Sequence, residues 1–113
     1  MFLYKVAQHP SGAQVVTIHG RVTFGRQSEQ CRAAVKDLLA AGTRRFVFDL
    51  AAVEYVDSAG IGFLVSCLTT LGQAGAKLRL ASPPERVRHV LEITHLTKVF
   101  EIFDTREQAL EWG

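Results

Sequence analysis

The segment from Asp57 to Gly62 reads Asp-Ser-Ala-Gly-Ile-Gly and places one hydroxyl group between an acidic residue and two glycines. It joins the apolar run 46–50 to an amphipathic stretch that begins at Ile61. A helix that starts here leaves its first backbone N–H groups without intrahelical partners, and the positive end of its dipole lies at the same point. The position of Ser58 at the N-terminus of a helix is therefore suited to an anion, such as a covalently attached phosphate.

A purely structural interpretation of this segment is also open. Asp57 or Ser58 can simply cap the helix, and the glycines can simply permit a tight turn from strand to helix. Asp57 is sufficient as a cap, however, so Ser58, Gly60 and Gly62 remain to be explained. Access to the turn explains all three, because glycine adds no side-chain bulk around the hydroxyl.

Other chemistries fit the sequence poorly. A nucleophile elbow needs glycine two residues to either side of the serine, and Val56 occupies one of those positions. The segment lacks the third glycine of a dinucleotide fingerprint, and the chain has no glycine-rich loop that ends in Gly-Lys-Ser or Gly-Lys-Thr. The four histidines show no metal-ligand spacing. We therefore expect no bound cofactor or metal and no catalytic triad.

The composition describes a small module. At 113 residues the chain forms one domain, 1–113, and its apolar fraction of 48% includes no run long enough to span a bilayer. The first residues lack the pattern of an export signal, which predicts a cytoplasmic protein. The net charge of +2 is dispersed, so no nucleic-acid partner is expected. Cys31 and Cys67 occupy helical positions and are predicted to be structural thiols.

Strand and helix patterns alternate along the chain. Strands are predicted at 2–6, 13–19, 46–50, 77–81 and 99–103, and helices at 27–41, 59–71, from the capping box 82–85 onward, and from 104 onward. Such alternation predicts an α/β fold with a mainly parallel sheet of four to five strands, covered by about four helices. The N-terminal strands are expected to pair antiparallel at one edge, and 46–50 is expected to be the central strand.

The helix after the turn has an apolar stripe at helical spacing, which is predicted to face the sheet and comprises Ile61, Leu64, Val65 and Leu68. A rotation of 100° per residue would then turn Phe63 away from the core, on the same side as Ala59 and Ser66. The predicted partner-binding patch accordingly comprises Asp57, Ser58, Ala59, Gly60, Gly62, Phe63 and Ser66.

The same residues carry a family resemblance. The run 46–50, Val53 and the segment 56–62 resemble the signature of the STAS domain, the fold of bacterial anti-sigma factor antagonists. The likeness extends over nearly the whole chain, because 20–22 resembles the early turn of the family, and 78–80 and 96–100 resemble its C-terminal half.

The resemblance implies a switch. In that family the serine directly after the aspartate is phosphorylated by a partner kinase that is also an anti-sigma factor, and the unphosphorylated form binds this kinase and frees the sigma factor. By position, the acceptor here is Ser58, with Asp57 beside it. The chain would then be a substrate and not an enzyme, with an anti-sigma factor serine kinase and a serine phosphatase as partners. Either a monomer or a weak dimer is compatible with this role.

Two departures from the family pattern stand out, and one alternative function is open. Thr23 occupies a position where many members carry Asp, and Ala59 one where many carry a second hydroxyl, so Ser58 is the one candidate acceptor in the turn. In the alternative, the chain is a STAS subunit docked on a membrane transporter, and the turn packs against a permanent partner. The retention of Ser58 beside Asp57 favours the switch.

Overall fold

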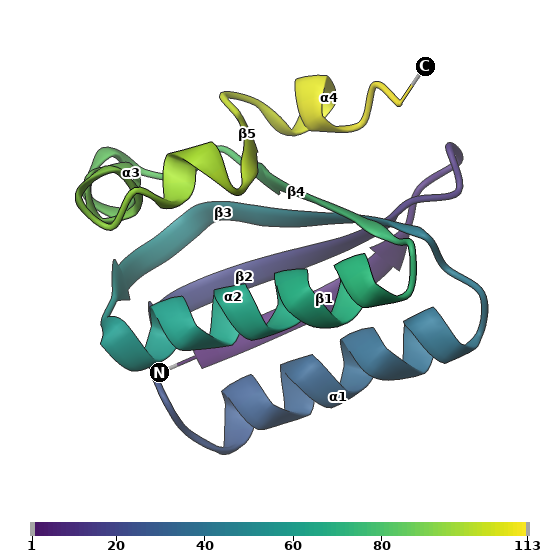
Figure 1. Cartoon of the computed structure of the whole chain (residues 1–113), viewed down its shortest axis with the longest axis horizontal. Coiled ribbons are helices and arrows are strands. Elements are labelled where there is room, and N and C mark those ends of the chain that lie inside the picture. The colour runs from purple at the N-terminus through teal and green to yellow at the C-terminus, as the bar shows by residue number, and fades with distance from the viewer. Residues whose placement is uncertain (1, 113) are drawn as a thin grey trace.

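The computed structural model describes residues 2–112, so Met1 and Gly113, the two ends of the predicted domain 1–113, lie outside the described residues. Figure 1 shows an α/β fold in which strands and helices alternate after an N-terminal hairpin. The elements are β1 (Phe2–Gln8), β2 (Gln14–Val22), α1 (Arg26–Ala40), β3 (Arg45–Val56), α2 (Ser58–Gln73), β4 (Lys77–Ala81), α3 (Glu85–Ile93), a 3₁₀ turn (Leu96–Lys98), β5 (Glu101–Phe103) and α4 (Arg106–Ala109).

The sheet has five strands in the order β1-β2-β3-β4-β5. β1 pairs antiparallel with β2, whereas the other neighbours are parallel. The predicted mainly parallel sheet with an antiparallel N-terminal edge is confirmed, as is the central place of the strand around 46–50. Because β2, β3 and β4 run in the same direction, their carboxyl ends meet at one edge of the sheet, where Asp57 and Ser58 follow β3 directly.

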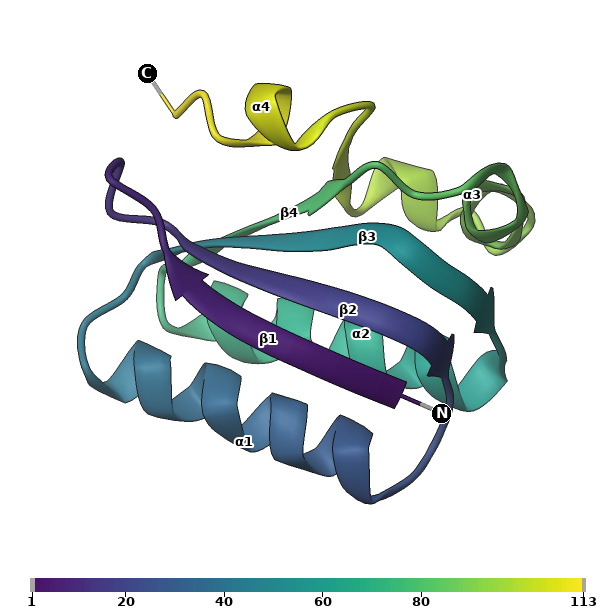
Figure 2. The same ribbon diagram turned by 180° about the vertical axis from the view of Figure 1, so that it is seen from behind.

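Both views of the ribbon place α1 and α2 side by side along one side of the sheet, while α3 and α4 lie across β3 and β4 from them (Figures 1 and 2). The first half of β3, from Phe46 to Leu50, is buried on both faces, as its near-continuous apolar run predicts. Phe46, Phe48 and Leu50 belong to the main core, and Val47 belongs to a second, smaller core with Ala109 of α4.

β3 is longer than the sequence pattern predicted, because it continues to Val56 where a loop was expected. In its second half Val53 and Val56 are buried, whereas Glu54 and Tyr55 between them are exposed. The burial does not follow a strict period of two here, because the register between β2 and β3 shifts between Gly20 and Arg21. Since β3 continues to Val56, α2 begins two residues after the strand ends, and no flexible loop separates the sheet from the turn that carries Ser58.

The capping box predicted at 82–85 is wrong. Ser82 adopts a left-handed conformation with φ of 55°, its hydroxyl donates to the backbone carbonyl of Asp104 at 3.1 Å, and α3 begins at Glu85 without a side-chain cap. The serine instead ties the end of β4 to the segment that follows β5, since its backbone N–H also donates to the carbonyl of Phe103 at 2.9 Å.

Arg79 of β4 makes several contacts with the C-terminal segment. The Arg79 guanidinium lies 3.8 Å from the centroid of the Trp112 ring and 4.9 Å from that of Phe103. It also donates to the backbone carbonyls of Ala109 and Glu111 at 3.2 and 2.9 Å. The planar face of the guanidinium stacks on the aromatic rings, and its N–H groups donate to the carbonyl groups. Arg79 thereby holds the end of the chain against β4.

The cysteines are buried and free, Cys31 in α1 and Cys67 in α2. Burial raises the pKa of both thiols to about 12, because desolvation penalises the thiolate. Both side chains belong to the main core, which confirms the prediction of structural thiols.

Candidate functional site

The turn between β3 and α2 is closed by Asp57, the N-cap residue of α2. The backbone N–H of Gly60 donates to its Oδ1 at 2.7 Å, and the N–H of Ile61 donates to its carbonyl oxygen at 2.9 Å. This is the predicted helix cap, and it uses the N–H of Gly60. Helix geometry leaves the N–H groups of Ser58 and Ala59 without an intrahelical acceptor.

Ser58 is the first residue of α2, and its side chain is exposed. Within residues 2–112 its hydroxyl makes no side-chain hydrogen bond, so it contributes nothing to the cap that Asp57 makes. The position confirms that this hydroxyl lies at the N-terminus of the second helix and faces solvent. A negative charge on it would be stabilised by the helix dipole, by about 0.3–1 kcal/mol at an exposed position.

Gly60 is not the open position that the sequence pattern suggested. It is buried, and a Cβ atom there would overlap the carbonyl oxygen of Val22 and lie 2.7 Å from its carbonyl carbon. Glycine is needed at this position because the end of β2 passes directly against the first turn of α2. The prediction that Gly60 opens the turn to a partner is therefore wrong, and its role is to let backbone approach backbone.

Phe63 also differs from prediction. It is only 8% exposed and contacts Phe2 of β1 edge-to-face, with ring centroids 5.6 Å apart and planes at 86°. The inner face of α2 is formed by Gly60, Phe63, Leu64, Cys67 and Leu71. The predicted stripe residues Ile61, Val65 and Leu68 are only partly buried at the flank of the core.

The face of α2 that is buried differs from the predicted one because of two neighbouring elements, which helical spacing alone does not reveal. β1 brings the Phe2 ring against the first turns of α2, and α1 packs beside α2. Relative to the predicted orientation, α2 is rotated about its axis so that Phe63 contacts Phe2, and the two rings adopt a favourable edge-to-face geometry.

A groove of about 310 Å³ opens between the N-terminal halves of α1 and α2. It is lined by Phe24, Ser28, Glu29, Arg32, Ala59, Gly62, Phe63 and Ser66. Three predicted site residues, Ala59, Gly62 and Ser66, thus lie in one hollow with the remaining exposed edge of Phe63. The sequence pattern missed the contribution of α1.

The most exposed apolar side chain of the groove is Phe24, which is 79% exposed and lies directly before α1. The lining contributed by α1 also includes Glu29 and Arg32, which form an ion pair at 3.2 Å. A signal for Phe24 was present in the sequence, since an aromatic residue next to Gly25 at a helix start has no place in the periodic stripe of that helix. An exposed phenyl ring beside a hollow is typical of a protein-binding surface.

Gly62 differs from Gly60 in having no internal reason to be glycine. A Cβ atom at 62 would meet nothing within 4 Å, and the residue is exposed within α2. Glycine inside a helix costs about 0.5–1 kcal/mol relative to alanine. No contact of a Cβ atom within the described residues offsets this cost, and the same holds for Gly72 near the end of the helix.

A family model for the STAS domain matches residues 4–109. This chain belongs to the STAS domain family. The predicted family and fold are thereby confirmed. Within residues 2–112, no helix is sufficiently long and apolar to cross a membrane.

Several similar proteins are named as anti-sigma factor antagonists. The candidate anti-sigma factor antagonist TM1081 homolog of Thermotoga neapolitana is 37% identical to this chain over 75 residues. The match covers 66% of this chain and 66% of the relative, so it spans just under two thirds of the relative's length. The anti-sigma-F factor antagonist RsfB of Mycobacterium tuberculosis is 28% identical over 105 residues, 93% of this chain and 84% of the relative. The crystal structure of a candidate anti-sigma factor antagonist from Thermotoga maritima matches with a TM-score of 0.82 at 28% identity, covering 98% of this chain and 92% of that one.

The burial of Phe63 makes a direct prediction. Phe63→Ala should lower the free energy of unfolding by about 3–5 kcal/mol, because it removes a core ring and leaves Phe2 without its partner. Phe24→Ala is the matched control, since it truncates a phenyl ring on the same groove that is mostly exposed, and it should change stability by less than about 0.5 kcal/mol. Urea unfolding followed by circular dichroism measures both. Equal stability of the two variants would contradict the packing described for α2.

Proposed function

We propose that this chain is an anti-sigma factor antagonist, which binds an anti-sigma factor kinase while Ser58 is unmodified and is released when Ser58 is phosphorylated. The observation that carries the proposal is the exposed Ser58 hydroxyl at the first position of α2, with the cap already made by Asp57. The names of the relatives support the antagonist role, and the family resemblance supports the kinase.

The charge change explains how one phosphate could switch binding without unfolding the domain. A phosphoserine adds about −1.5 to −2 charges at pH 7. The N-terminus of α2 favours this charge, and the residues of the main core are not involved. A partner surface that accepts a neutral serine beside Asp57 would instead meet clustered negative charge. The switch acts on the surface while the fold is retained.

In this proposal the chain is a kinase substrate and not a catalyst. The kinase supplies Mg-ATP and the residue that accepts the serine proton, and a serine phosphatase restores the binding form. These reactions would take place in the cytoplasm. The binding surface is the turn 57–59 together with the groove between α1 and α2, including Gly62 and Ser66.

Phosphorylation at Ser58 can be mapped directly. The chain is incubated with Mg-ATP and a purified histidine-kinase-like ATPase encoded beside its gene, and fragment mass spectra should place one phosphate on Ser58. Ser58→Ala should remain unmodified. Phosphate on Thr69 or Thr70, which lie on the same helix, would contradict the proposed switch. A gene neighbourhood with an ABC permease and no such kinase would favour the transporter alternative.

Substitution at Ser58 should separate binding from folding. Ser58→Ala is expected to bind the same kinase as tightly as the unmodified chain, whereas Ser58→Asp should weaken binding by about 1–3 kcal/mol through unfavourable charge at the interface. Thr69→Asp places the same charge at an exposed position further along α2 and is the control. Titration calorimetry with parallel thermal melts measures both properties, and equal affinity of the two Ser58 variants would refute the proposal.

The helix glycines provide a test of the groove. Gly62→Leu and Gly72→Leu both replace a glycine of α2 at which a Cβ atom meets nothing within 4 Å. Both variants should be at least as stable as the parent chain, since leucine is a strong helix former. Only Gly62→Leu fills the groove, so only it should weaken kinase binding, by about tenfold or more. If both variants bind alike, the kinase does not use this groove.

A further inference from the structure

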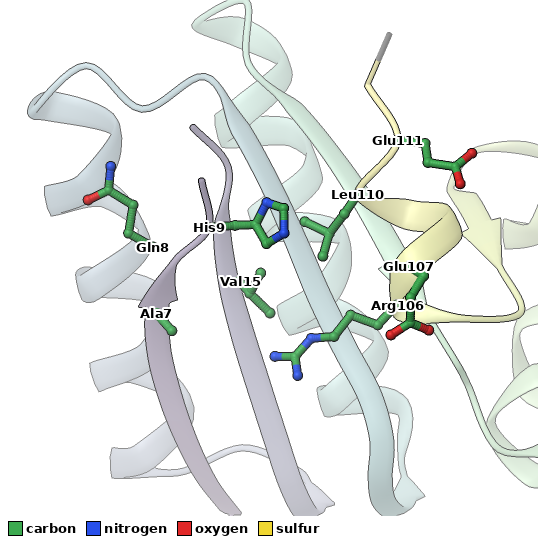
Figure 3. A pocket seen from close by; sticks show the side chains of 8 residues that line it. All are labelled: Ala7, Gln8, His9, Val15, Arg106, Glu107, Leu110 and Glu111. Atoms are coloured by element: carbon green, nitrogen blue, oxygen red, sulfur yellow. The ribbon is translucent and has the colours of Figure 1, made fainter. Parts of the chain in front are cut away.

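A second hollow lies away from Ser58. It has a volume of about 500 Å³ and separates the β1–β2 hairpin from α4 (Figure 3). Val15 on its floor is at the start of β2, in register with Val47 at the start of β3. Ser58 follows the carboxyl end of β3. Because these strands are parallel, the hollow and Ser58 lie at opposite ends of the sheet, and the hollow is independent of the switch proposed above.

The floor of the hollow is apolar. Ala7 and Val15 are register partners on β1 and β2, and Leu110 follows α4. Figure 3 shows the Leu110 side chain facing the imidazole of His9 above Val15. Pockets that bind small molecules combine such an apolar lining with a few fixed polar groups, and a volume of this size falls within their usual range.

Arg106 supplies the first fixed polar group. Its Nε lies 3.5 Å from Oδ2 of Asp49, and its Nη2 donates to Oγ1 of Thr17 at 3.1 Å. Thr17 and Asp49 are register partners on β2 and β3, so both hold the guanidinium from the same face of the sheet. Nη1 has no hydrogen-bond partner within residues 2–112. The arginine is thus oriented by two strands and keeps donors free toward the hollow.

His9 supplies the second polar group. The backbone N–H of Ser11 donates to Nδ1 of His9 at 3.1 Å, which makes Nδ1 an acceptor and assigns the proton of the neutral ring to Nε2. The ring is therefore held by the hairpin turn and presents a second N–H donor at the hollow. Two donors from opposite walls, with an apolar floor between them, favour a ligand that has an acceptor group and an apolar body.

The charges around Arg106 limit the ligand further. Asp49 already compensates part of the guanidinium charge, and Glu107 lies on the lining of the hollow. The carboxylate of Glu111 points away from His9 and Arg106 in Figure 3. A dianion such as phosphate would be repelled by the nearby carboxylates, whereas a single carboxylate can use the free donors.

We propose that the hollow between the β1–β2 hairpin and α4 binds a small apolar monocarboxylate, with its carboxylate on Arg106 and its apolar body on Val15 and Leu110. The ligand enters beside the edge strand β1, where Ala7 is exposed. This would give the domain a small-molecule site at the end of the sheet opposite Ser58.

The test uses 3-phenylpropanoate as the probe and follows the amide resonances of the ¹⁵N-labelled chain by NMR. Saturable shifts are expected at Val15, Arg106 and Leu110. The neutral isostere 3-phenylpropanamide should bind about tenfold more weakly, and inorganic phosphate should not produce these shifts. No saturable shift up to about 10 mM, or equal binding of the amide or of phosphate, would overturn the proposal.

Two variants and one control make the test specific. Ala7→Leu fills the hollow from the edge strand without touching Arg106, and it should abolish the shifts. Val6→Leu changes the neighbouring residue, whose side chain points to the other face of β1, and it should bind like the parent chain. Arg106→Gln should weaken binding of the carboxylate to the level of the amide. Since this variant leaves Asp49 without its cation, thermal melts accompany it, and Ala7→Leu provides an independent result. Unchanged binding by Ala7→Leu would refute the site.

Discussion

The close approach of Gly60 to the carbonyl group of Val22 is the constraint on which the rest of the site depends. It brings the end of β2 against the first turn of α2, and the backbone N–H of Asp57 donates to the same carbonyl at 3.4 Å. The height of the turn above the sheet is therefore set by backbone contacts, which no side-chain rearrangement can relax. A side chain at position 60 would move the helix start, the cap and the Ser58 hydroxyl together.

The same contact helps to decide which side of α2 faces inward. With Gly60 against β2, the next inward position one turn along is Phe63, and its ring meets Phe2 of the edge strand. The flank of α2 that faces α1 carries Ala59, Gly62 and Ser66, which are small and leave a hollow against the start of α1. The groove is thus a by-product of how the core is packed, with small residues where a larger one would fill it.

The sequence predicted the elements that depend on local patterns and missed those that depend on distant neighbours. The buried strand around Phe48 and the cap at Asp57 follow from apolar runs and capping chemistry, both local to the chain. The orientation of Phe63 depends on Phe2 of β1, which is distant in the sequence. Ser82 matched a capping box but binds the carbonyl of Asp104 instead, because tertiary pairing overrides a local motif.

The contacts of Arg79 affect the local stability of the C-terminal segment. β5 has three residues and α4 has four, so few backbone hydrogen bonds hold this part of the fold, and a single side chain from β4 holds Trp112 and two carbonyls. Such a segment opens as a local cooperative unit at a lower free energy than the whole domain. Its amide hydrogens would exchange before those of β3. Arg106 and Leu110 belong to this unit, so any molecule that they hold would also slow its opening. The hydrogen-exchange rates of the C-terminal segment would then report whether the hollow beside α4 is occupied.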